Sequence, residues 1–279
     1  MRDASDEALN RIIEGTRQAL AGSGGRLAML GLAGAQGSGK STLAARLKAR
    51  MDESGVPTAL LSIDDLYLGH AARAQLAERV HPLLRTRGVP GTHDVALGLA
   101  VIAALERGED ALLPRFDKGT DDRLPIAQWD RAPLGTRLLL FEGWCVGARP
   151  RTPAALDPPI NLLERQEDAD GHWRRFVHDA LAGPYQRLFA RIDRLVFLAA
   201  PDFAIVSRWR AQQEEKLRAS GHGMDDAALA RFIQHYERIT RHMLADMPAH
   251  ADMTIALDTE RQVVAVRDKG DGRRTHERR

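Results

Sequence analysis

The sequence has only one cysteine, Cys145, among its 279 residues. A single thiol excludes a disulfide within the chain and a metal site built from several cysteines. We expect Cys145 to act as a small buried hydrophobic residue, as free cysteines usually do. No apolar stretch approaches the roughly 18 residues of a membrane span, and the acidic first residues lack the apolar core of a signal peptide. We therefore expect a soluble, cytoplasmic protein with no membrane partner.

Net charge is also nearly absent, because 40 Lys and Arg residues face 38 Asp and Glu residues and leave a net charge of +2. With 44% hydrophobic and 28% charged residues, the composition is that of a globular protein and excludes wholesale disorder. Basic residues gather at residues 267–279, which we expect to form a disordered tail. A nucleic-acid-binding arm would need aromatic residues or a longer basic run, so no nucleic-acid partner is expected.

Short apolar runs alternate with helical patterns along the chain. An amphipathic helix is predicted over residues 4–21, and buried strands are predicted over residues 27–33, 58–63, 137–141, 195–199 and 253–257. Further helices are predicted over residues 40–51, 94–107, 173–191, 202–219 and 225–246. This alternation indicates an α/β fold with a parallel sheet covered on both faces. Two long loops, 80–93 and 114–135, are rich in proline, glycine and charge, and such loops often carry a site.

A complete phosphate-binding motif follows the first predicted strand. Residues 34–41 match G-x-x-x-x-G-K-[ST], with a strand before and a helix after. The glycines let successive N–H groups turn toward phosphate oxygens, and the new helix adds free N–H groups and its positive dipole end. Lys40 supplies a charge for the terminal phosphates and Ser41 a hydroxyl for Mg²⁺. We assign nucleotide binding to Gly34, Ala35, Gln36, Gly37, Ser38, Gly39, Lys40, Ser41 and Thr42.

Carboxylates close two of the predicted strands. The second strand runs into Asp64 and Asp65, and the third ends at Glu142. Ligands bind at the carboxyl edge of open α/β sheets, so Asp64 can accept the proton of an attacking hydroxyl, as the base of a small-molecule kinase does. Glu142 can hold Mg²⁺ through water. The alternatives are that the aspartates only cap the following turn and that Glu142 is a solvated strand end.

Two arginines, Arg208 and Arg210, lie in the helix predicted after the fourth strand. An arginine there can fold over the transferring phosphate as part of a lid and neutralise charge in the transition state. We favour Arg210 for this role, and the alternative is an ordinary solvated helix face. The predicted catalytic residues are therefore Asp64, Lys40 and Arg210.

Taken together, these blocks resemble the P-loop kinases of small metabolites, which include uridine kinase, phosphoribulokinase and pantothenate kinase. The D-glycerate 3-kinases of the plant type and their bacterial relatives are the more similar branch. Matching blocks lie at residues 34–41, 62–67, 87–94, 114–118, 122–123, 141–144 and 209–210. The resemblance implies a P-loop kinase fold with a five-stranded parallel sheet and a helical lid. It also implies that Asp64 is the catalytic base and that Glu142 helps to organise Mg²⁺.

Basic residues of the two long loops indicate the character of the substrate. A planar guanidinium can donate two parallel hydrogen bonds to a carboxylate, so these loops suit an acidic acceptor such as glycerate better than a neutral nucleoside. The candidate cations are Arg85, Arg87, His93, Arg115, Lys118 and Arg123. We assign substrate binding to Asp65, Tyr67, Arg87, His93, Arg115 and Lys118.

The sequence therefore predicts an ATP- and Mg²⁺-dependent kinase that converts D-glycerate to 3-phosphoglycerate. We expect one kinase domain over residues 1–266, with its lid at about 202–225. Within the same class, the alternative is a kinase of the uridine or pantothenate kinase type. From other classes, the alternatives are a nucleotide-binding regulatory protein without phosphotransfer and a nucleic-acid-associated ATPase that uses the basic tail. The sequence sets neither the oligomeric state nor a role for residues 150–190.

Overall fold

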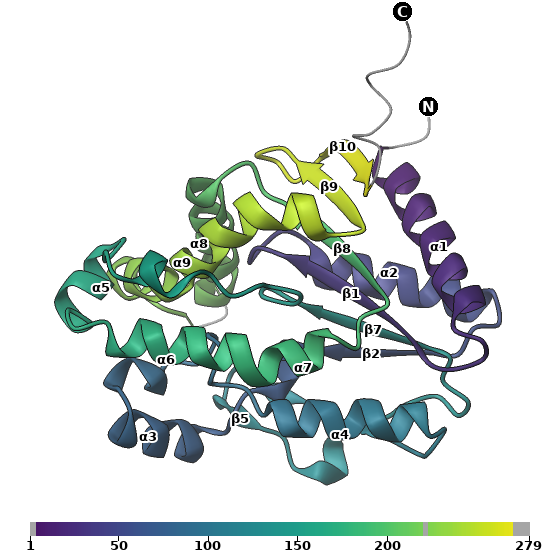
Figure 1. Ribbon diagram of the computed structural model, residues 1–279, viewed down its shortest axis with the longest axis horizontal. Helices are drawn as coiled ribbons and strands as arrows, with labels where there is room; N and C mark the ends of the chain where they lie inside the picture. Colours follow the sequence, from purple (N-terminus) through teal and green to yellow (C-terminus); the bar gives the residue numbers. More distant parts are fainter. Residues whose placement is uncertain (1–3, 220–222, 270–279) are drawn as a thin grey trace, which may run out of the picture.

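The computed structural model describes residues 4–219 and 223–269 and contains a central six-stranded sheet. In sheet order the strands are β10 (Val263–Asp268), β9 (Met253–Leu257), β8 (Arg194–Ala199), β1 (Ala28–Gly34), β7 (Leu138–Gly143) and β2 (Thr58–Ser62) (Figure 1). All but β10 run parallel, and each parallel strand coincides with one of the five predicted apolar runs. The predicted parallel α/β sheet is therefore confirmed.

β10 is the strand of this sheet that the sequence did not predict. It pairs antiparallel with β9 at the edge, and its side chains are partly or fully exposed. It does contain a short apolar run, Val263 to Val266, to which no strand was assigned from the sequence. β10 ends at Asp268, so the first two residues of the expected tail lie in the sheet, whereas residues 270–279 of that tail lie outside the described residues.

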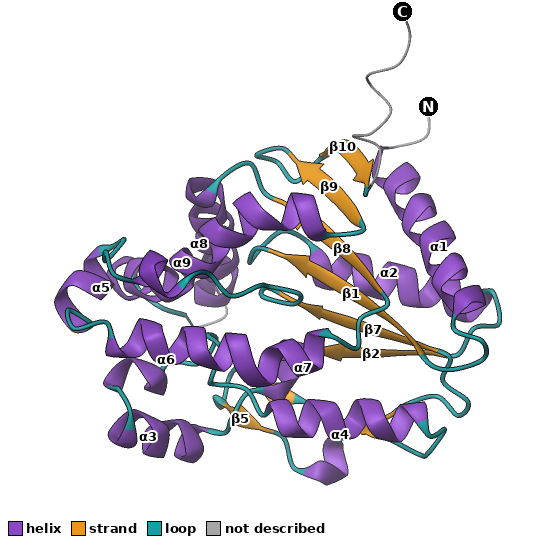
Figure 2. Ribbon diagram, viewed as in Figure 1, coloured by secondary structure: helices purple, strands orange, loops and turns teal. Residues whose placement is uncertain are grey.

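Helices cover both faces of the sheet (Figure 2). Strand side chains such as Leu140 pack on one face with the helices over residues 4–22 and 40–53, and the next residue, Phe141, packs on the other with the helices over residues 95–106, 172–180 and 186–189. Successive side chains of a strand point to opposite faces, and both sets are apolar because both faces are covered. The helices are α1 (Ala4–Gly22), α2 (Lys40–Glu53), α3 (His70–Arg79), α4 (Val95–Glu106), α5 (Leu162–Glu167), α6 (His172–Ala180), α7 (Gln186–Phe189), α8 (Phe203–Ala219) and α9 (Asp226–His250).

The predicted helices are present, and α3 and α5 are additions to them. α3 buries only Arg73 and Ala77 and has no apolar stripe, and α5 has only six residues, so neither shows the periodicity of an amphipathic helix. The helix predicted over 173–191 is α6 and α7, joined by a π-helical turn, Leu181–Tyr185. None of the helices in the described part of the chain combines the length and apolar character that crossing a membrane requires.

The connections between these helices and strands contain short elements. The 3₁₀ turns are Ile63–Leu66, Pro82–Arg85, Ile126–Gln128 and Pro153–Leu156, and the two-residue strands are β3 (Leu112–Leu113), β4 (Phe116–Asp117), β5 (Asp122–Arg123) and β6 (Asp130–Arg131). β4 and β5 form a hairpin, and β3 pairs with β6. Cys145 is fully buried, as expected.

The strand order reverses at β1, which lies between β7 and β8. Ligands of open α/β sheets bind outside the carboxyl ends of the strands at such a switch point. In Figure 1 the arrowheads of β1, β7 and β2 point toward the side of the molecule where α8 and α9 lie. The fold therefore places the expected ligand site at this edge of the sheet.

Candidate active site

A cavity of about 570 Å³ lies at the carboxyl edge of the sheet. Its walls come from the loop after β1, the first turn of α2, the ends of β2 and β7, the β4–β5 hairpin and helices α8 and α9. The lining residues are Gln36, Gly37, Gly39, Lys40, Ser41, Thr42, Ser62, Asp64, Tyr67, Arg87, Lys118, Glu142, Gly143, Trp144, Arg210, Gln213, Phe232 and Tyr236. Its size is within the range of small-molecule sites, roughly 300–1,000 Å³.

The phosphate-binding loop forms one wall of the cavity. α2 begins at Lys40, so the N–H groups of its first turn have no helical acceptor and remain available for a ligand. Lys40 Nζ donates across the loop to the Ala35 carbonyl oxygen (3.0 Å). Gly37 has φ +78°, and a Cβ there would lie 2.7 Å from Cβ of Trp209 on α8. Gly34, Ala35 and Ser38 are buried and do not line the cavity, unlike the other six residues assigned to the nucleotide.

Ser41 and Glu142 meet in this cavity. Ser41 Oγ donates to Glu142 Oε1 (3.0 Å), and Glu142 is held at the end of β7 beside β1. Hydroxyl and carboxylate oxygens are ligands that Mg²⁺ accepts together with phosphate oxygens and water. Over residues 4–219 and 223–269, no group of three His, Cys, Asp or Glu side chains could hold a metal ion alone. The donor set at Ser41 and Glu142 fits a Mg²⁺ ion whose remaining ligands come from phosphate and water.

Asp64 stands in the 3₁₀ turn after β2, where its N–H donates to Ser62 Oγ (3.2 Å). Its carboxylate accepts two side-chain hydrogen bonds, Oδ1 from Tyr67 Oη (2.8 Å) and Oδ2 from Lys118 Nζ (2.6 Å). Burial on its own raises the pKa of Asp64, but the Lys118 charge and the two hydrogen bonds outweigh it and hold the pKa below its usual range. Asp64 is therefore an ionised carboxylate at neutral pH.

The cavity carries an excess of positive charge. Four basic side chains and two acidic ones line it: Lys40, Arg87, Lys118 and Arg210 against Asp64 and Glu142. Burial lowers the pKa of Lys40, while the neighbouring carboxylates oppose that shift. A cleft with a surplus of one charge concentrates ligands of the opposite charge. The arrangement therefore favours anionic ligands.

Asp65 and Arg115, both assigned to the substrate, do not line the cavity. Asp65 Oδ2 accepts from Arg115 Nη1 (3.1 Å), and its Oδ1 accepts from a backbone N–H of β4 (3.1 Å). These contacts fasten the β4–β5 hairpin to the turn after β2. Arg85 and Arg123 also lie outside the cavity lining, and Arg123 pairs with Asp94 (3.3 Å).

His93 lies behind Tyr67 and also does not line the cavity. The two rings stack with centroids 4.5 Å apart, and His93 Nδ1 lies 2.5 Å from Tyr185 Oη. The Tyr185 oxygen also accepts the Gly91 N–H (3.0 Å). Burial lowers the pKa of His93 to about 4. A neutral, buried imidazole cannot supply the charge that was expected of it, and His93 instead supports the ring of Tyr67.

Arg87 is held near the cavity by a buried arginine that the sequence analysis did not select. Arg73 on α3 is fully buried and donates to the carbonyl oxygens of Leu68 (2.5 Å) and Arg85 (3.2 Å). It also pairs with Asp121, and Asp121 pairs in turn with Arg87. One carboxylate therefore joins the β4–β5 hairpin to α3 and to the loop over residues 80–93.

Phe232 and Tyr236 on α9 complete the cavity wall. Tyr236 Oη donates to the Arg87 carbonyl oxygen (2.9 Å), and its ring meets Trp144 edge-on, with centroids 4.9 Å apart. Gly88 has φ +131°, and a Cβ there would overlap the Tyr236 hydroxyl. Neither α9 residue was predicted from the sequence, because an aromatic residue in an amphipathic helix has the same spacing whether it faces the core or a cavity.

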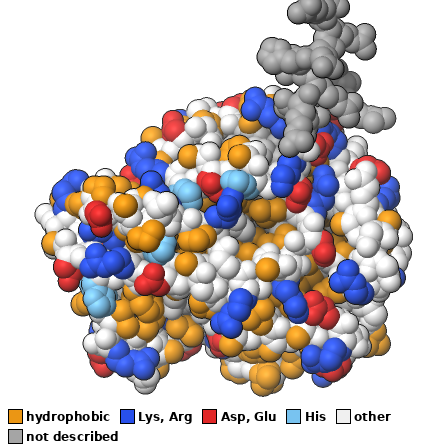
Figure 3. All heavy atoms as spheres, viewed as in Figure 1, with side chains coloured by type: hydrophobic (Ala, Val, Ile, Leu, Met, Phe, Trp, Pro, Cys, Tyr) orange, Lys and Arg blue, Asp and Glu red, His pale blue; other side chains and the backbone are white. Residues whose placement is uncertain are grey.

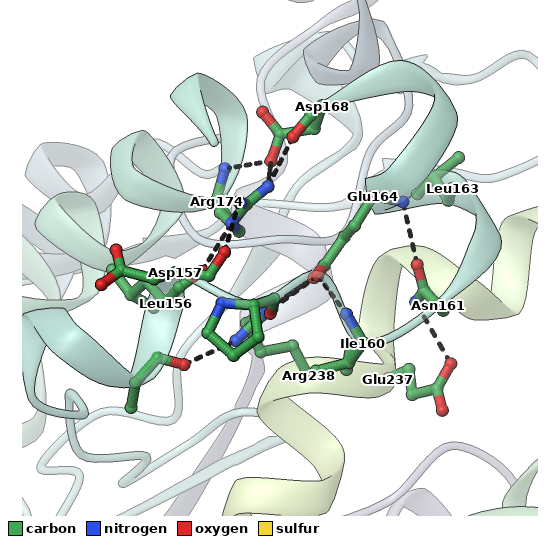
Figure 4. A network of polar contacts seen from close by, with 12 residues as sticks. Leu156, Asp157, Ile160, Asn161, Leu163, Glu164, Asp168, Arg174, Glu237 and Arg238 are labelled. Atoms are coloured by element: carbon green, nitrogen blue, oxygen red, sulfur yellow. Dashed lines mark hydrogen bonds and ion pairs between the residues drawn. The ribbon is translucent and has the colours of Figure 1, made fainter. Parts of the chain in front are cut away.

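A buried polar network holds the next two residues of α9, Glu237 and Arg238 (Figure 4). Arg238 donates to both carboxylate oxygens of Glu164 on α5 (2.8 and 2.5 Å) and to the carbonyl oxygen of Pro158 (2.7 Å). Beside it, Asn161 Nδ2 donates to Glu237 Oε2 (3.1 Å). The segment for which the sequence indicated no role thus holds the turn of α9 next to Tyr236.

Arg210, rather than Arg208, lies at the cavity. Its guanidinium pairs with Glu214 (2.6 Å) and lies over the Phe232 ring, 5.4 Å from the centroid. Arg208 donates instead to the Thr259 carbonyl oxygen (2.9 Å) in the β9–β10 turn. α8 forms most of the expected lid region, and residues 220–222 of that region lie outside the described residues.

The β9–β10 turn also reaches the phosphate loop. Arg261 in this turn donates to the Gly37 carbonyl oxygen (2.7 Å) and to Gln212 Oε1 on α8 (2.7 Å). Trp209 Nε1 donates to the Thr259 carbonyl oxygen (2.8 Å). The loop, α8 and the C-terminal strand pair are thus joined at one point.

No protein-family model matches the chain. Over 222 residues it is 39% identical to the uncharacterized kinase mug58 of Schizosaccharomyces pombe, an alignment that covers 76% of this chain and 79% of the relative. It is 28% identical to the chloroplastic D-glycerate 3-kinase of Arabidopsis thaliana, over 85% of this chain and 54% of the plant enzyme. The chain thus spans about half the length of that enzyme.

The solved structure of a D-glycerate 3-kinase from Cryptococcus neoformans has the same fold, with a TM-score of 0.77 and 25% sequence identity. The superposition covers 94% of this chain and 99% of the fungal one. Both sequence relatives are kinases, and the phosphate loop and the sheet order of this chain are consistent with that. The chain belongs to the family of P-loop kinases that includes the D-glycerate 3-kinases.

Proposed function

We propose that the chain transfers the γ-phosphoryl group of ATP to D-glycerate and forms 3-phosphoglycerate. The observation that supports an acidic acceptor is that Arg87 and Lys118 line the same cavity as Asp64 and the phosphate loop. Charge-assisted hydrogen bonds from such cations are among the stronger polar contacts in proteins. The names of the plant relative and the fungal structural neighbour support glycerate as that acceptor.

In this proposal ATP lies on the phosphate loop with Lys40 and Arg210 directed at the transferred group. Ser41 and Glu142 hold Mg²⁺, which neutralises charge on the phosphates when it is bound. Asp64 accepts the proton of the acceptor hydroxyl, whose oxygen attacks the γ-phosphorus while the bond to the leaving oxygen of ADP breaks. Tyr67 keeps the Asp64 carboxylate oriented through its hydrogen bond. Residues 1–266 act as one kinase domain, and residues 202–225 act as its lid.

A panel of phosphoryl acceptors tests this proposal. ADP release from wild-type protein with Mg-ATP is measured with D-glycerate, glycerol, uridine and pantothenate, and the phosphorylated product is identified by mass spectrometry and NMR. We expect ADP release that depends on D-glycerate and yields 3-phosphoglycerate. If D-glycerate causes no ADP release while uridine or pantothenate does, the acceptor assignment is wrong. If no acceptor stimulates turnover, the proposed glycerate kinase activity is wrong.

A further inference from the structure

Asp64 has a donor on each of its oxygens before any acceptor is bound. Tyr67 donates to Oδ1 and Lys118 to Oδ2. The tyrosine contact orients the carboxylate, whereas the ammonium contact stabilises its charge and so makes it a weaker base. For Asp64 to take a proton efficiently, the Lys118 contact has to be broken.

Lys118 differs from the other cations of the cavity in its ion partner. Arg87 pairs with Asp121, and Arg210 pairs with Glu214, neither of which lines the cavity. Lys40 donates to a backbone carbonyl oxygen of the phosphate loop. Among the cavity-lining cations of the described residues, Lys118 is the one ion-paired with Asp64.

Lys118 can leave Asp64 without disturbing the hairpin that carries it. It follows β4 at the tip of the β4–β5 hairpin, and its side chain is 60% exposed. The tip is held by its neighbour Asp117, which accepts from the Gly119 N–H (2.8 Å) and from Thr120 Oγ1 (2.8 Å). The backbone of the turn is therefore fixed, while a flexible four-carbon stem carries the charge.

We propose that Lys118 restrains Asp64 until an acidic group of the acceptor draws the ammonium away. The carboxylate of the acceptor offers Lys118 a partner equivalent to Asp64. Binding of the acceptor therefore also frees Asp64 from Lys118. The acceptor hydroxyl then gives its proton to Asp64, its oxygen bonds to the γ-phosphorus, and the bond to the ADP oxygen breaks. Water lacks a carboxylate, so it finds Asp64 still paired, and ATP is spared from hydrolysis. This inference deepens the proposed function and rests on it for the identity of the acceptor.

The decisive measurement is ATP hydrolysis in the absence of any acceptor. Lys118→Met keeps the length of the side chain and removes its charge, and we expect it to raise the acceptor-free rate of ADP release about tenfold, a modest part of what a positioned base contributes. Lys118→Arg keeps the charge and should therefore raise that rate less than Lys118→Met does. Lys48→Met is the matched control, because Lys48 forms a 2.6 Å pair with Asp52 on α2, away from the cavity.

The second measurement compares D-glycerate with glycerol, which has the hydroxyls but no carboxylate. The wild-type preference for D-glycerate in kcat/KM should fall about ten- to hundredfold in Lys118→Met, the effect of losing one charge-assisted hydrogen bond. An acceptor-free rate in Lys118→Met at or below the wild-type rate, with ATP affinity retained, overturns the restraint. Failure of wild-type protein to use D-glycerate overturns the proposed acceptor instead, and the hydrolysis measurement then still decides whether Lys118 restrains the base.

Discussion

Asp64 shows how one residue depends on its immediate neighbours. Its position at the carboxyl end of β2 follows from the sequence, since an apolar run ends directly before it. Its two donors do not, because Lys118 is 54 positions away in the chain and reaches it only through the β4–β5 hairpin. The sequence therefore indicates the base, whereas its charge state and orientation are properties of the fold.

Asp64→Asn should lower turnover by about a hundredfold or more, because the amide cannot accept the acceptor's proton. ATP affinity should be retained, since the phosphate loop is unchanged. Steady-state kinetics and nucleotide titration check both parts. Asp65→Asn is the matched control: Asp65 lies outside the cavity lining and fastens the β4–β5 hairpin to the turn after β2, so its loss should affect stability more than turnover. Near-normal turnover in Asp64→Asn would refute the assignment of the base.

Gly88→Ala should weaken the acceptor side of the cavity. The new Cβ has to displace the Tyr236 hydroxyl, which is bonded to the Arg87 carbonyl, and it also has to adopt φ +131°. We expect a higher KM for the acceptor and a loss of stability beyond that of a positive φ alone. Gly108→Ala is the control for a positive φ without a close contact, because Gly108 has φ +70° and open space around its Cβ position. This control should lower the free energy of unfolding by about 1 kcal/mol. Equal losses in the two variants would rule out the contact with Tyr236.

At the scale of elements, the helices and strands that could be predicted are those marked by a local pattern of apolar residues. β1 and β7 are continuous apolar runs because helices cover both of their faces. α3 escapes prediction because its buried anchor is Arg73, whose partners come from two loops and the β4–β5 hairpin. The contribution of α9 to the site is missed because Phe232 and Tyr236 have the helical spacing of core residues. The network of Figure 4 that holds α9 also joins it to residues elsewhere in the chain. Long-range polar contacts of this kind leave no periodic pattern.

Glu164→Gln should lower the free energy of unfolding by about 3 kcal/mol or more, because Arg238 is left as a buried charge without its carboxylate. Glu167→Gln is a closely matched control: Glu167 pairs with Arg231 and joins the same two helices, α5 and α9, but both side chains are half-exposed. An exposed pair of this kind contributes at most about 1 kcal/mol. Urea unfolding of both variants provides the test, and equal losses would contradict a structural role for the buried pair.

At the scale of the whole molecule, the small net charge is distributed rather than absent. Figure 3 shows acidic and basic side chains interspersed over one face, with hydrophobic atoms between them. The cavity differs, with four basic residues to two acidic ones. Composition gives the sum of these charges, but only the fold determines where the excess lies.

Stability should fall as the pH drops from 7 to 5. Burial lowers the pKa of both His93 and His235 to about 4, whereas an unfolded chain protonates histidine near 6.5. Between these values the unfolded state binds protons that the folded state excludes, so unfolding becomes more favourable as pH falls. Each histidine accounts for about 2 kcal/mol at pH 5.

His235→Leu checks this dependence, since it should reduce the stability loss between pH 7 and pH 5 by about 2 kcal/mol in urea unfolding. His235 packs against Trp173, with Arg231 and Glu167 nearby, so the leucine variant also keeps an apolar contact there. His70→Leu, on the exposed surface of α3, is the matched control. A pH dependence identical to that of the wild type in His235→Leu would show that the buried imidazole does not titrate as proposed.

The guanidinium of Arg261 connects the β9–β10 strand pair to the phosphate loop. It bonds the Gly37 carbonyl oxygen on one side and α8 on the other, although Gly37 and Arg261 are 224 positions apart. A nucleotide that stabilises the phosphate loop should also stabilise the segments hydrogen-bonded to the loop through Arg261. Such coupling between two sites is reciprocal. Amide hydrogens of β10 should therefore exchange more slowly with solvent when ATP is bound. The C-terminal edge of the sheet would then report on nucleotide occupancy at the far end of the chain.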